Sequence, residues 1–240
     1  MVRKLLPFLL GVAFVAALVL VVPLLRELPS AKPVKTDLVE VARARGATWV
    51  PLDRVPQPLR EAIIATEDSR FYEHRGLDLV GAARAITANL RAGRLVQGGS
   101  TLSQQLAKLY LERWDVSVER KLLVLGMAVK LEMTYSKDEI LEMYLNSVYF
   151  GPYAYGIGSA GRVYFGKPVE ALDLAESTLL AGLPQAPSLY DPIHQLDRVK
   201  VRQGVVIAAM TRAGYLTADQ ASAARTARTA LDRSAPTAAP

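Results

Sequence analysis

The chain has 240 residues, of which 51% are hydrophobic, and it contains no cysteine. The lack of cysteine excludes a disulfide framework and a thiolate metal centre, and two histidines in the whole chain argue against a histidine-based one. The formal net charge of +6 at pH 7 favours an anionic partner. No Lys/Arg-rich run is interleaved with aromatic residues, so an anionic lipid surface or head group is favoured over nucleic acid.

The first predicted element is a membrane anchor. Residues 5–25 carry no charge and lie between the basic pair Arg3-Lys4 and Arg26. A helix of this length spans a bilayer core, and the leading basic pair predicts that residues 1–4 are cytoplasmic and that the rest of the chain is external. A cleaved signal peptide is the alternative, but the apolar run exceeds the about 7–15 residues of a signal sequence and no small-residue cleavage site follows. A linker is expected over 26–45.

The predicted external domain covers residues 46–228. Residues 36–50 are expected to form an irregular segment or a short strand. The following segments read almost entirely as helices, which predicts a mainly α domain. The expected helices cover 77–95, 101–109, 118–133, 136–145, 158–164, 169–183, 195–213 and 217–228, after a first one that begins near 58. Ser136 and Glu139 fit a capping box at the start of the helix over 136–145. Residues 229–240 are rich in Ala, Thr and Pro and are predicted to be disordered.

The end of the first domain helix carries a candidate catalytic residue. Glu67 falls four residues after Ile63 and four before Phe71, so the three side chains share one helix face. A carboxylate on an apolar stripe is expected to be buried, and burial raises its pKa toward the value that a general acid or base needs near neutral pH. The alternative is a structural glutamate, partly buried and held by Arg70 or Arg75.

A second motif begins after a Gly-Gly pair that ends the helix over 77–95. Ser100 or Thr101 can cap the next helix, and Thr101 with the glutamine three residues on fits a capping box. Thr101, Gln105 and Lys108 form one polar stripe. Free N–H groups at a helix start form an anion site, to which Lys108 adds a point charge for a phosphate. The alternative is an ordinary amphipathic helix with a solvated polar face.

Cations at the start of a later helix strengthen the indication of an anionic ligand. Arg120 and Lys121 are adjacent in the first turn of the helix over 118–133, where positive charge opposes the helix dipole. Cations in a locally unfavourable position indicate a functional role, such as binding a pyrophosphate.

Ordered motifs along residues 50–212 carry a resemblance to a known family. The chief ones are Glu67-Asp68-x-x-Phe71-x-x-His74-x-Gly76, then Gly98-Gly99-Ser100-Thr101-x-x-Gln104-Gln105-x-x-Lys108, and Arg120-Lys121. In these motifs the chain resembles the peptidoglycan glycosyltransferases (transglycosylases, family 51 glycosyltransferases) of the monofunctional biosynthetic type. The resemblance implies a lysozyme-like helical glycosyltransferase domain preceded by one N-terminal transmembrane helix, in the bacterial inner (cytoplasmic) membrane with the domain on the periplasmic side.

The resemblance also implies a reaction. Lipid II is polymerised into β-1,4 glycan strands with inversion, and polyprenyl pyrophosphate is released. Glu67 matches the general base, and residues 91–97 match a mobile, membrane-facing jaw. The expected substrate-binding residues are Asp68, Phe71, His74, Gly99, Ser100, Thr101, Gln104, Gln105, Lys108, Arg120 and Lys121. The expected partners are lipid II, the lipid-linked glycan strand, the membrane and other cell-wall synthesis proteins, but not nucleic acid.

Three positions depart from the family pattern, all on the pyrophosphate side. Val124 stands where the family has a second glutamate, Leu109 where it has asparagine, and Val116 where it has a basic residue. These losses keep open a non-catalytic or weakly active regulator that binds lipid II or glycan. A lysozyme-like hydrolase is a weaker third interpretation. No cofactor is certain; a divalent cation (Mg²⁺ or Mn²⁺) is left open, and no metal ligand is assigned.

Overall fold

The computed structural model describes residues 23, 26–94, 98–112, 117–186, 189–227 and 229–232. The predicted cytoplasmic segment and nearly all of the predicted anchor over 5–25 lie outside these residues, as do Val116 and most of the C-terminal tail. None of the helices in the described ranges has the length and apolar character that crossing a membrane requires.

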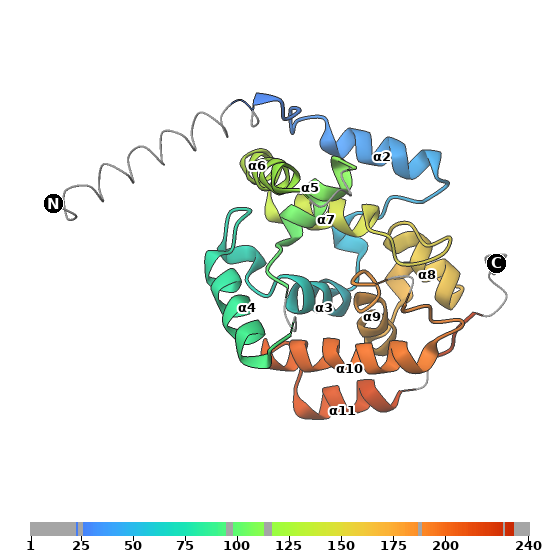
Figure 1. Cartoon of the computed structure of the whole chain (residues 1–240). Helices are drawn as coiled ribbons and strands as arrows, with labels where there is room; N and C mark the ends of the chain where they lie inside the picture. The colour runs from blue at the N-terminus through green and yellow to red at the C-terminus, as the bar shows by residue number, and fades with distance from the viewer. Residues whose placement is uncertain are drawn as a thin grey trace.

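The described part of the chain is helical, as predicted, and its only β pairing is one isolated antiparallel bridge between Tyr149 and Tyr155. In Figure 1, α3 crosses the middle of the domain, with α4 beside it, α10 and α11 below it, and α5, α6, α7 and α2 above it. The α-helices are α2 (Val34–Ala44), α3 (Gln57–Glu67), α4 (Leu79–Ala92), α5 (Leu102–Tyr110), α6 (Val118–Thr134), α7 (Lys137–Ser147), α8 (Ile157–Phe165), α9 (Leu174–Ala181), α10 (Leu196–Arg212) and α11 (Ala218–Thr226). Short 3₁₀ turns are η1 (Leu52–Arg54), η2 (Phe71–Glu73) and η3 (Val169–Ala171).

Helix α2 corrects the expectation of an irregular or extended segment after residue 36. Its buried residues are Val34, Leu38 and Ala42, which are spaced four apart and therefore form one stripe along the helix. Val34 is completely buried, and both Val34 and Leu38 belong to the main hydrophobic core. Much of the segment expected as a linker over 26–45 is thus packed on the domain.

The segment between α2 and α3 is held by side chains of α7 rather than by a sheet. Asn146 accepts a hydrogen bond from the Val50 N–H and donates one to the Val50 carbonyl, both at 2.8 Å. Glu142 accepts from the Trp49 indole N–H at 3.1 Å and from the Leu52 N–H at 2.9 Å. These bonds satisfy backbone groups that a strand would pair with a neighbour.

Side-chain caps decide where several helices begin. Ser136 and Glu139 form the predicted capping box at the start of α7. The single helix predicted over 169–183 is instead divided into η3 and α9. The division occurs because Asp173 accepts from the Glu176 N–H while Glu176 returns a bond to the Asp173 N–H, so a second box starts a new helix there.

Helix α3 is the centre of the core. It packs against α9 and α10, and its residues Leu59, Ala62 and Ile63 have no exposed surface. The two flanking helices are locked together by Gln203 of α10, whose amide donates to the Ala175 carbonyl of α9 at 2.7 Å. The acidic residue that ends α3 is therefore carried by the most enclosed helix of the domain.

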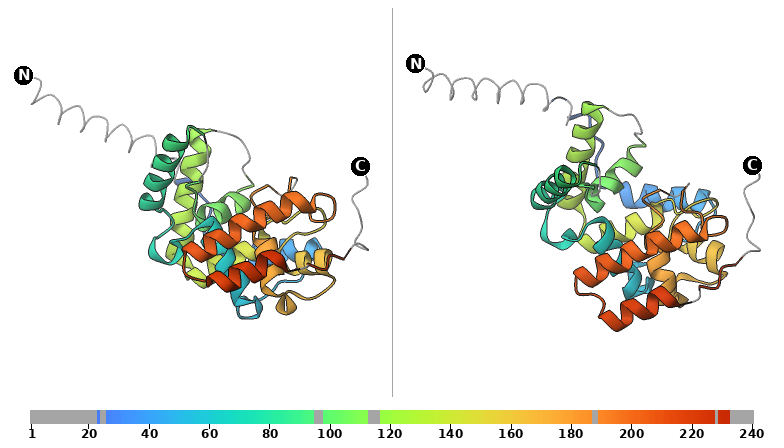
Figure 2. Two further views of the ribbon diagram at one scale, coloured as in Figure 1. Left: turned by 90° about the horizontal axis from the view of Figure 1, so that it is seen from below. Right: turned by 60° about the horizontal axis from the view of Figure 1, so that its bottom comes forward.

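The first residues of the C-terminal tail are ordered, which corrects a second expectation. Residues 229–232 were predicted to be disordered, but the Asp232 N–H donates to the Tyr164 carbonyl at 2.8 Å and Thr229 accepts from Lys200 at 3.0 Å. Leu231 packs against the core. In Figure 2 this stretch runs from α11 back along the domain toward α8, and the remainder, 233–240, lies outside the described residues.

Candidate functional site

Glu67 is the last residue of α3 and lies almost inside the protein. Its side chain keeps only 13% of its surface exposed, in line with its predicted place on the apolar stripe. One carboxylate oxygen, Oε2, accepts a hydrogen bond from the Gln105 amide of α5 at 2.9 Å. Burial raises the pKa of Glu67, and this effect outweighs the lowering by the Gln105 hydrogen bond and by the positive charge of Arg202.

Gln105 is itself oriented by a buried tyrosine. The Tyr144 hydroxyl, on α7, donates to Gln105 Oε1 at 3.1 Å, so the amide nitrogen of Gln105 is turned toward Glu67. Burial and the nearby charge of Glu67 raise the pKa of Tyr144 well above its ordinary value, so the hydroxyl keeps its proton. The arrangement favours a Glu67 that is ready to accept a proton, because the amide N–H stabilises the ionised carboxylate.

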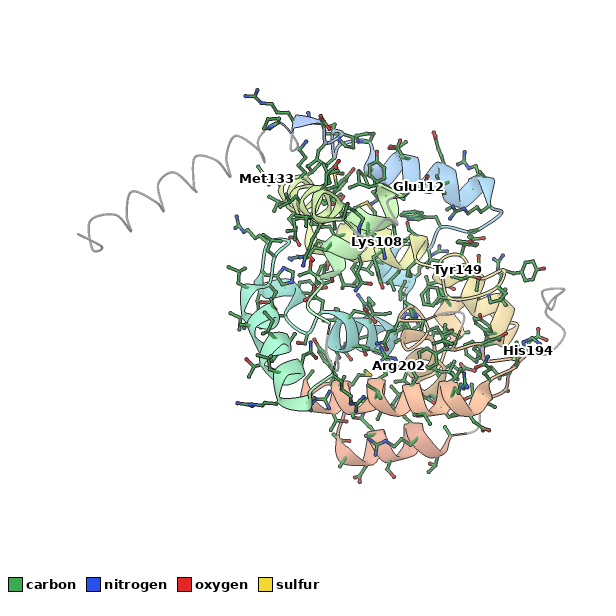
Figure 3. The ribbon with its side chains drawn as sticks, in the orientation of Figure 1. Lys108, Glu112, Met133, Tyr149, His194 and Arg202 are labelled. Carbon is green, nitrogen blue, oxygen red and sulfur yellow. The ribbon has the colours of Figure 1, made fainter. Side chains whose placement is uncertain are left out.

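The cation that faces Glu67 is Arg202, which the sequence interpretation missed. Its Nη2 lies 3.9 Å from Glu67 Oε1. Of the two arginines expected instead, Arg70 pairs with Glu73 and Asp78. Figure 3 shows Arg202 on α10 and Lys108 on α5, on opposite sides of α3 in that view.

A signal for Arg202 was present in the sequence. Arg202 follows Val199 by three residues and precedes Val206 by four, and both valines are buried. A cation on an apolar helix stripe is the same pattern that singled out Glu67. The periodicity could identify Arg202 as buried, but not as the partner of Glu67.

Asp68 joins the end of α3 to the start of α5. Its Oδ2 accepts from the Leu102 N–H at 2.9 Å, and both of its oxygens lie 3.0 Å from His74 Nε2. Both side chains are buried. The Asp68 oxygens are turned toward His74 Nε2 and toward the backbone of α5, which gives this pair a positioning role in this structure rather than an exposed binding surface.

The start of α5 also carries the predicted cap. Thr101 accepts from the Gln104 N–H at 3.2 Å and donates to the Gly76 carbonyl at 2.7 Å. The expected capping box is only half formed, because the Gln104 amide donates to the Gly76 carbonyl at 3.1 Å instead. Gly76 has a φ of +84°, and a Cβ there would lie 3.1 Å from the backbone of Ala128 in α6. Gly76 therefore allows this close packing of α5, α6 and the first motif.

The remaining predicted binding residues fall into two groups. Gly99 and Ser100 are exposed just before α5, Lys121 is exposed on α6, and Lys108 and Arg120 are half-buried. Phe71, by contrast, is completely buried, with the Lys137 ammonium 4.5 Å from its ring centroid. The ring of Phe71 thus packs in the core and presents no surface to a substrate.

Across the described ranges, no group of three His, Cys, Asp or Glu side chains comes together in a way that could hold a metal ion. The divalent cation that the sequence leaves open stays a prediction.

A buried carboxyl that is held by an amide and faced by a guanidinium can take part in acid–base chemistry. The family model described as Transglycosylase matches residues 35–211. The chain belongs to this transglycosylase family, in agreement with the resemblance of its motifs.

Two curated relatives agree with this assignment. Penicillin-binding protein 1A of Escherichia coli (strain K12) is 46% identical over 177 residues, which are 74% of this chain and 21% of that protein. Penicillin-binding protein 1A of Aquifex aeolicus (strain VF5) is 40% identical over 236 residues, which cover 91% of this chain and 32% of that protein. A crystal structure of penicillin-binding protein 1A from Haemophilus influenzae is 25% identical with a TM-score of 0.47 and covers 77% of this chain and 18% of that one. The chain spans between 21% and 32% of the length of these two curated relatives.

Proposed function

We propose that this protein is a membrane-anchored peptidoglycan glycosyltransferase that polymerises lipid II into β-1,4 glycan strands. The membership of the transglycosylase family supports the reaction class. The uncharged run over 5–25 supports a single-pass anchor in the bacterial inner membrane, with the domain on the periplasmic side. The observation that carries the proposal is the buried Glu67 carboxylate, held by an amide of the helix that starts after Gly99.

In the proposed reaction Glu67 is the general base. Its carboxylate takes the proton from the 4-hydroxyl of the acceptor lipid II as that oxygen attacks the anomeric carbon of the lipid-linked donor chain. The new bond joins the anomeric carbon to the acceptor oxygen, the bond to the pyrophosphate oxygen breaks, and polyprenyl pyrophosphate leaves with the electron pair. Attack opposite to the leaving group inverts the anomeric carbon.

The leaving pyrophosphate requires positive charge and N–H donors. Lys108 on α5 with Arg120 and Lys121 on α6 supply cations from two helices that pack against each other. At the start of α5 the Leu102 N–H already donates to Asp68 and the Gln104 N–H donates to Thr101, so the proposed stabilisation of the pyrophosphate rests on the cations. Charge stabilisation of this kind can contribute about 10²–10³ in rate, which is comparable to the general base itself.

The test is polymerisation of lipid II by the purified full-length protein in detergent or vesicles. Glu67→Gln is expected to lower the rate by about 10²–10⁴, the usual contribution of a general base. Glu73→Gln is the matched control, because it makes the same change six residues on at a side chain that is 61% exposed. Full activity of Glu67→Gln would remove the assigned role, and release of soluble muropeptides from cell wall would favour the hydrolase instead.

A second candidate is a non-catalytic or weakly active regulator that binds lipid II or glycan. One observation favours it: Val124, which stands in place of the family's second glutamate, is half-buried and packs against the hydrophobic core. No carboxylate is available at that position to assist the departure of pyrophosphate. A wild-type protein that binds lipid II without polymerising it, and gains activity from Val124→Glu, would support this candidate.

A further inference from the structure

The surroundings of the Glu67 carboxylate are asymmetric. Gln105 donates a hydrogen bond to Oε2 at 2.9 Å, whereas Arg202 lies on the side of Oε1. The distance of 3.9 Å from Arg202 Nη2 to Oε1 exceeds that of a hydrogen bond, so the guanidinium acts on the carboxylate through its charge. Because the Arg202 side chain is only 11% exposed, little solvent screens this charge.

Arg202 is held in this position from the far side. Its Nε–H donates to the Gly182 carbonyl, at the C-terminal end of α9, at 3.2 Å. A Cβ at Gly182 would lie 2.9 Å from Arg202 Cγ, so only glycine leaves room for the arginine stem. The next residue, Gln203, bonds to α9 through the Ala175 carbonyl. The guanidinium is thus placed by the α9–α10 junction before any ligand arrives.

We propose that Arg202 is a positioning residue for the general base: its fixed positive charge keeps the Glu67 carboxylate ionised and leaves Oε1 to receive the proton of the acceptor hydroxyl. This inference rests on the proposed function. A hydrogen bond from Arg202 would use one of the acceptor sites of Oε1, whereas a charge at 3.9 Å stabilises the anion without using any of them.

The electrostatic balance supports this role. Burial raises the pKa of Glu67, the Gln105 hydrogen bond and the charge of Arg202 lower it, and the charge of Asp68 raises it slightly. Without Arg202, the amide would be the main group opposing burial. A larger fraction of Glu67 would then be protonated near neutral pH and unable to act as a base.

Other charged groups on the packed helices are directed elsewhere. On α9, Glu176 pairs with Lys167 at 2.7 Å. On α10, Lys200 donates to the Thr229 hydroxyl and Arg198 donates to the Gln195 side chain. The groups that act on the Glu67 carboxyl are Asp68 beside it, Gln105 on α5, Arg202 on α10 and, through Gln105, the neutral Tyr144 on α7.

The experiment measures the pH profile of lipid II polymerisation for the full-length wild type, Arg202→Met and Arg202→Lys. Arg198→Met is the matched control, since it removes the same charge one helical turn earlier at an exposed position. For Arg202→Met the acid limb of kcat/KM should move to higher pH, with a loss of about tenfold on that limb, as expected when one nearby opposite charge is lost. The alkaline plateau should change much less. Arg202→Lys should restore most of the acid limb, and Arg198→Met should leave the profile in place.

A second measurement follows the protonation of the Glu67 carboxyl directly. The Glu67 side chain is followed by ¹³C NMR titration in detergent, with its signal assigned by its loss in Glu67→Gln. Its midpoint should move to higher pH in Arg202→Met and return toward the wild-type value in Arg202→Lys. An unshifted midpoint, or an equal loss of rate at every pH, would overturn the inference. If the wild type does not polymerise lipid II, the proposed function fails, while the titration still decides the role of Arg202.

Discussion

Replacing Asp68 with alanine is expected to loosen the junction that places Glu67 against α5. The Asp68 carboxylate accepts from the backbone N–H of Leu102, the first residue of α5, and is paired with His74. Its side chain is only 3% exposed, so no water replaces these partners when the carboxylate is removed. The substitution leaves a helix-start N–H and an imidazole nitrogen buried without an acceptor.

The size of the effect follows from these contacts. A buried donor that is left without its acceptor costs about 1–3 kcal/mol, and here two donors, the Leu102 N–H and the His74 ring nitrogen, lose theirs. For a domain of this size a loss of that magnitude lowers Tm by about 10 °C. Because α5 also carries Gln105, a displaced α5 would move the amide away from Glu67 and lower the polymerisation rate as well.

Thermal unfolding of the purified protein, followed by circular dichroism, is the assay. Glu73→Ala is the control, since it truncates an acid in an exposed pair with Arg70 only five residues away, and such pairs contribute about 0–1 kcal/mol. The double variant with His74→Ala should lose much less than the sum of the two single variants, because both remove the same interaction. A melting temperature for Asp68→Ala within about 2 °C of the wild type, a change typical of surface substitutions, would refute the reasoning.

Three further predictions concern the same site. In a denaturant titration, Gly76→Ala should lower the free energy of unfolding by about 2 kcal/mol more than Gly46→Ala does. Both glycines have a positive φ, but only a Cβ at Gly76 would press on the backbone of α6. Glu67→Gln should raise Tm at alkaline pH. Burial raises the folded-state pKa of Glu67, so the contribution of this carboxyl to stability is present at low pH and is lost as pH rises through that pKa. The gain in Tm of the glutamine variant should therefore vanish when melting is measured in acid. Tyr144→Phe should lower kcat by about tenfold with little change in KM, since Gln105 would lose the hydroxyl that orients its amide, and an unchanged kcat would exclude that orienting role.

Local sequence patterns were sufficient to predict most of the helices. The Ser136 box and the Thr101 cap lie where the sequence predicts them, because a cap depends on groups three residues apart. The burial of Glu67 was likewise readable, since its spacing from Ile63 defines a helix face. Helix α2 was missed although its stripe was present, and the break at Asp173 was missed because a helix was extended across a residue that can also start one.

The sequence by itself determined the helical class, the caps and the burial of an acid on an apolar stripe, because these depend on side chains within one or two turns of each other. Only the tertiary structure decided which groups meet that acid. Gln105 reaches Glu67 from α5 and Arg202 reaches it from α10, and these contacts depend on how the helices cross. Periodicity defines which face of each helix is buried, but not which helix lies against that face.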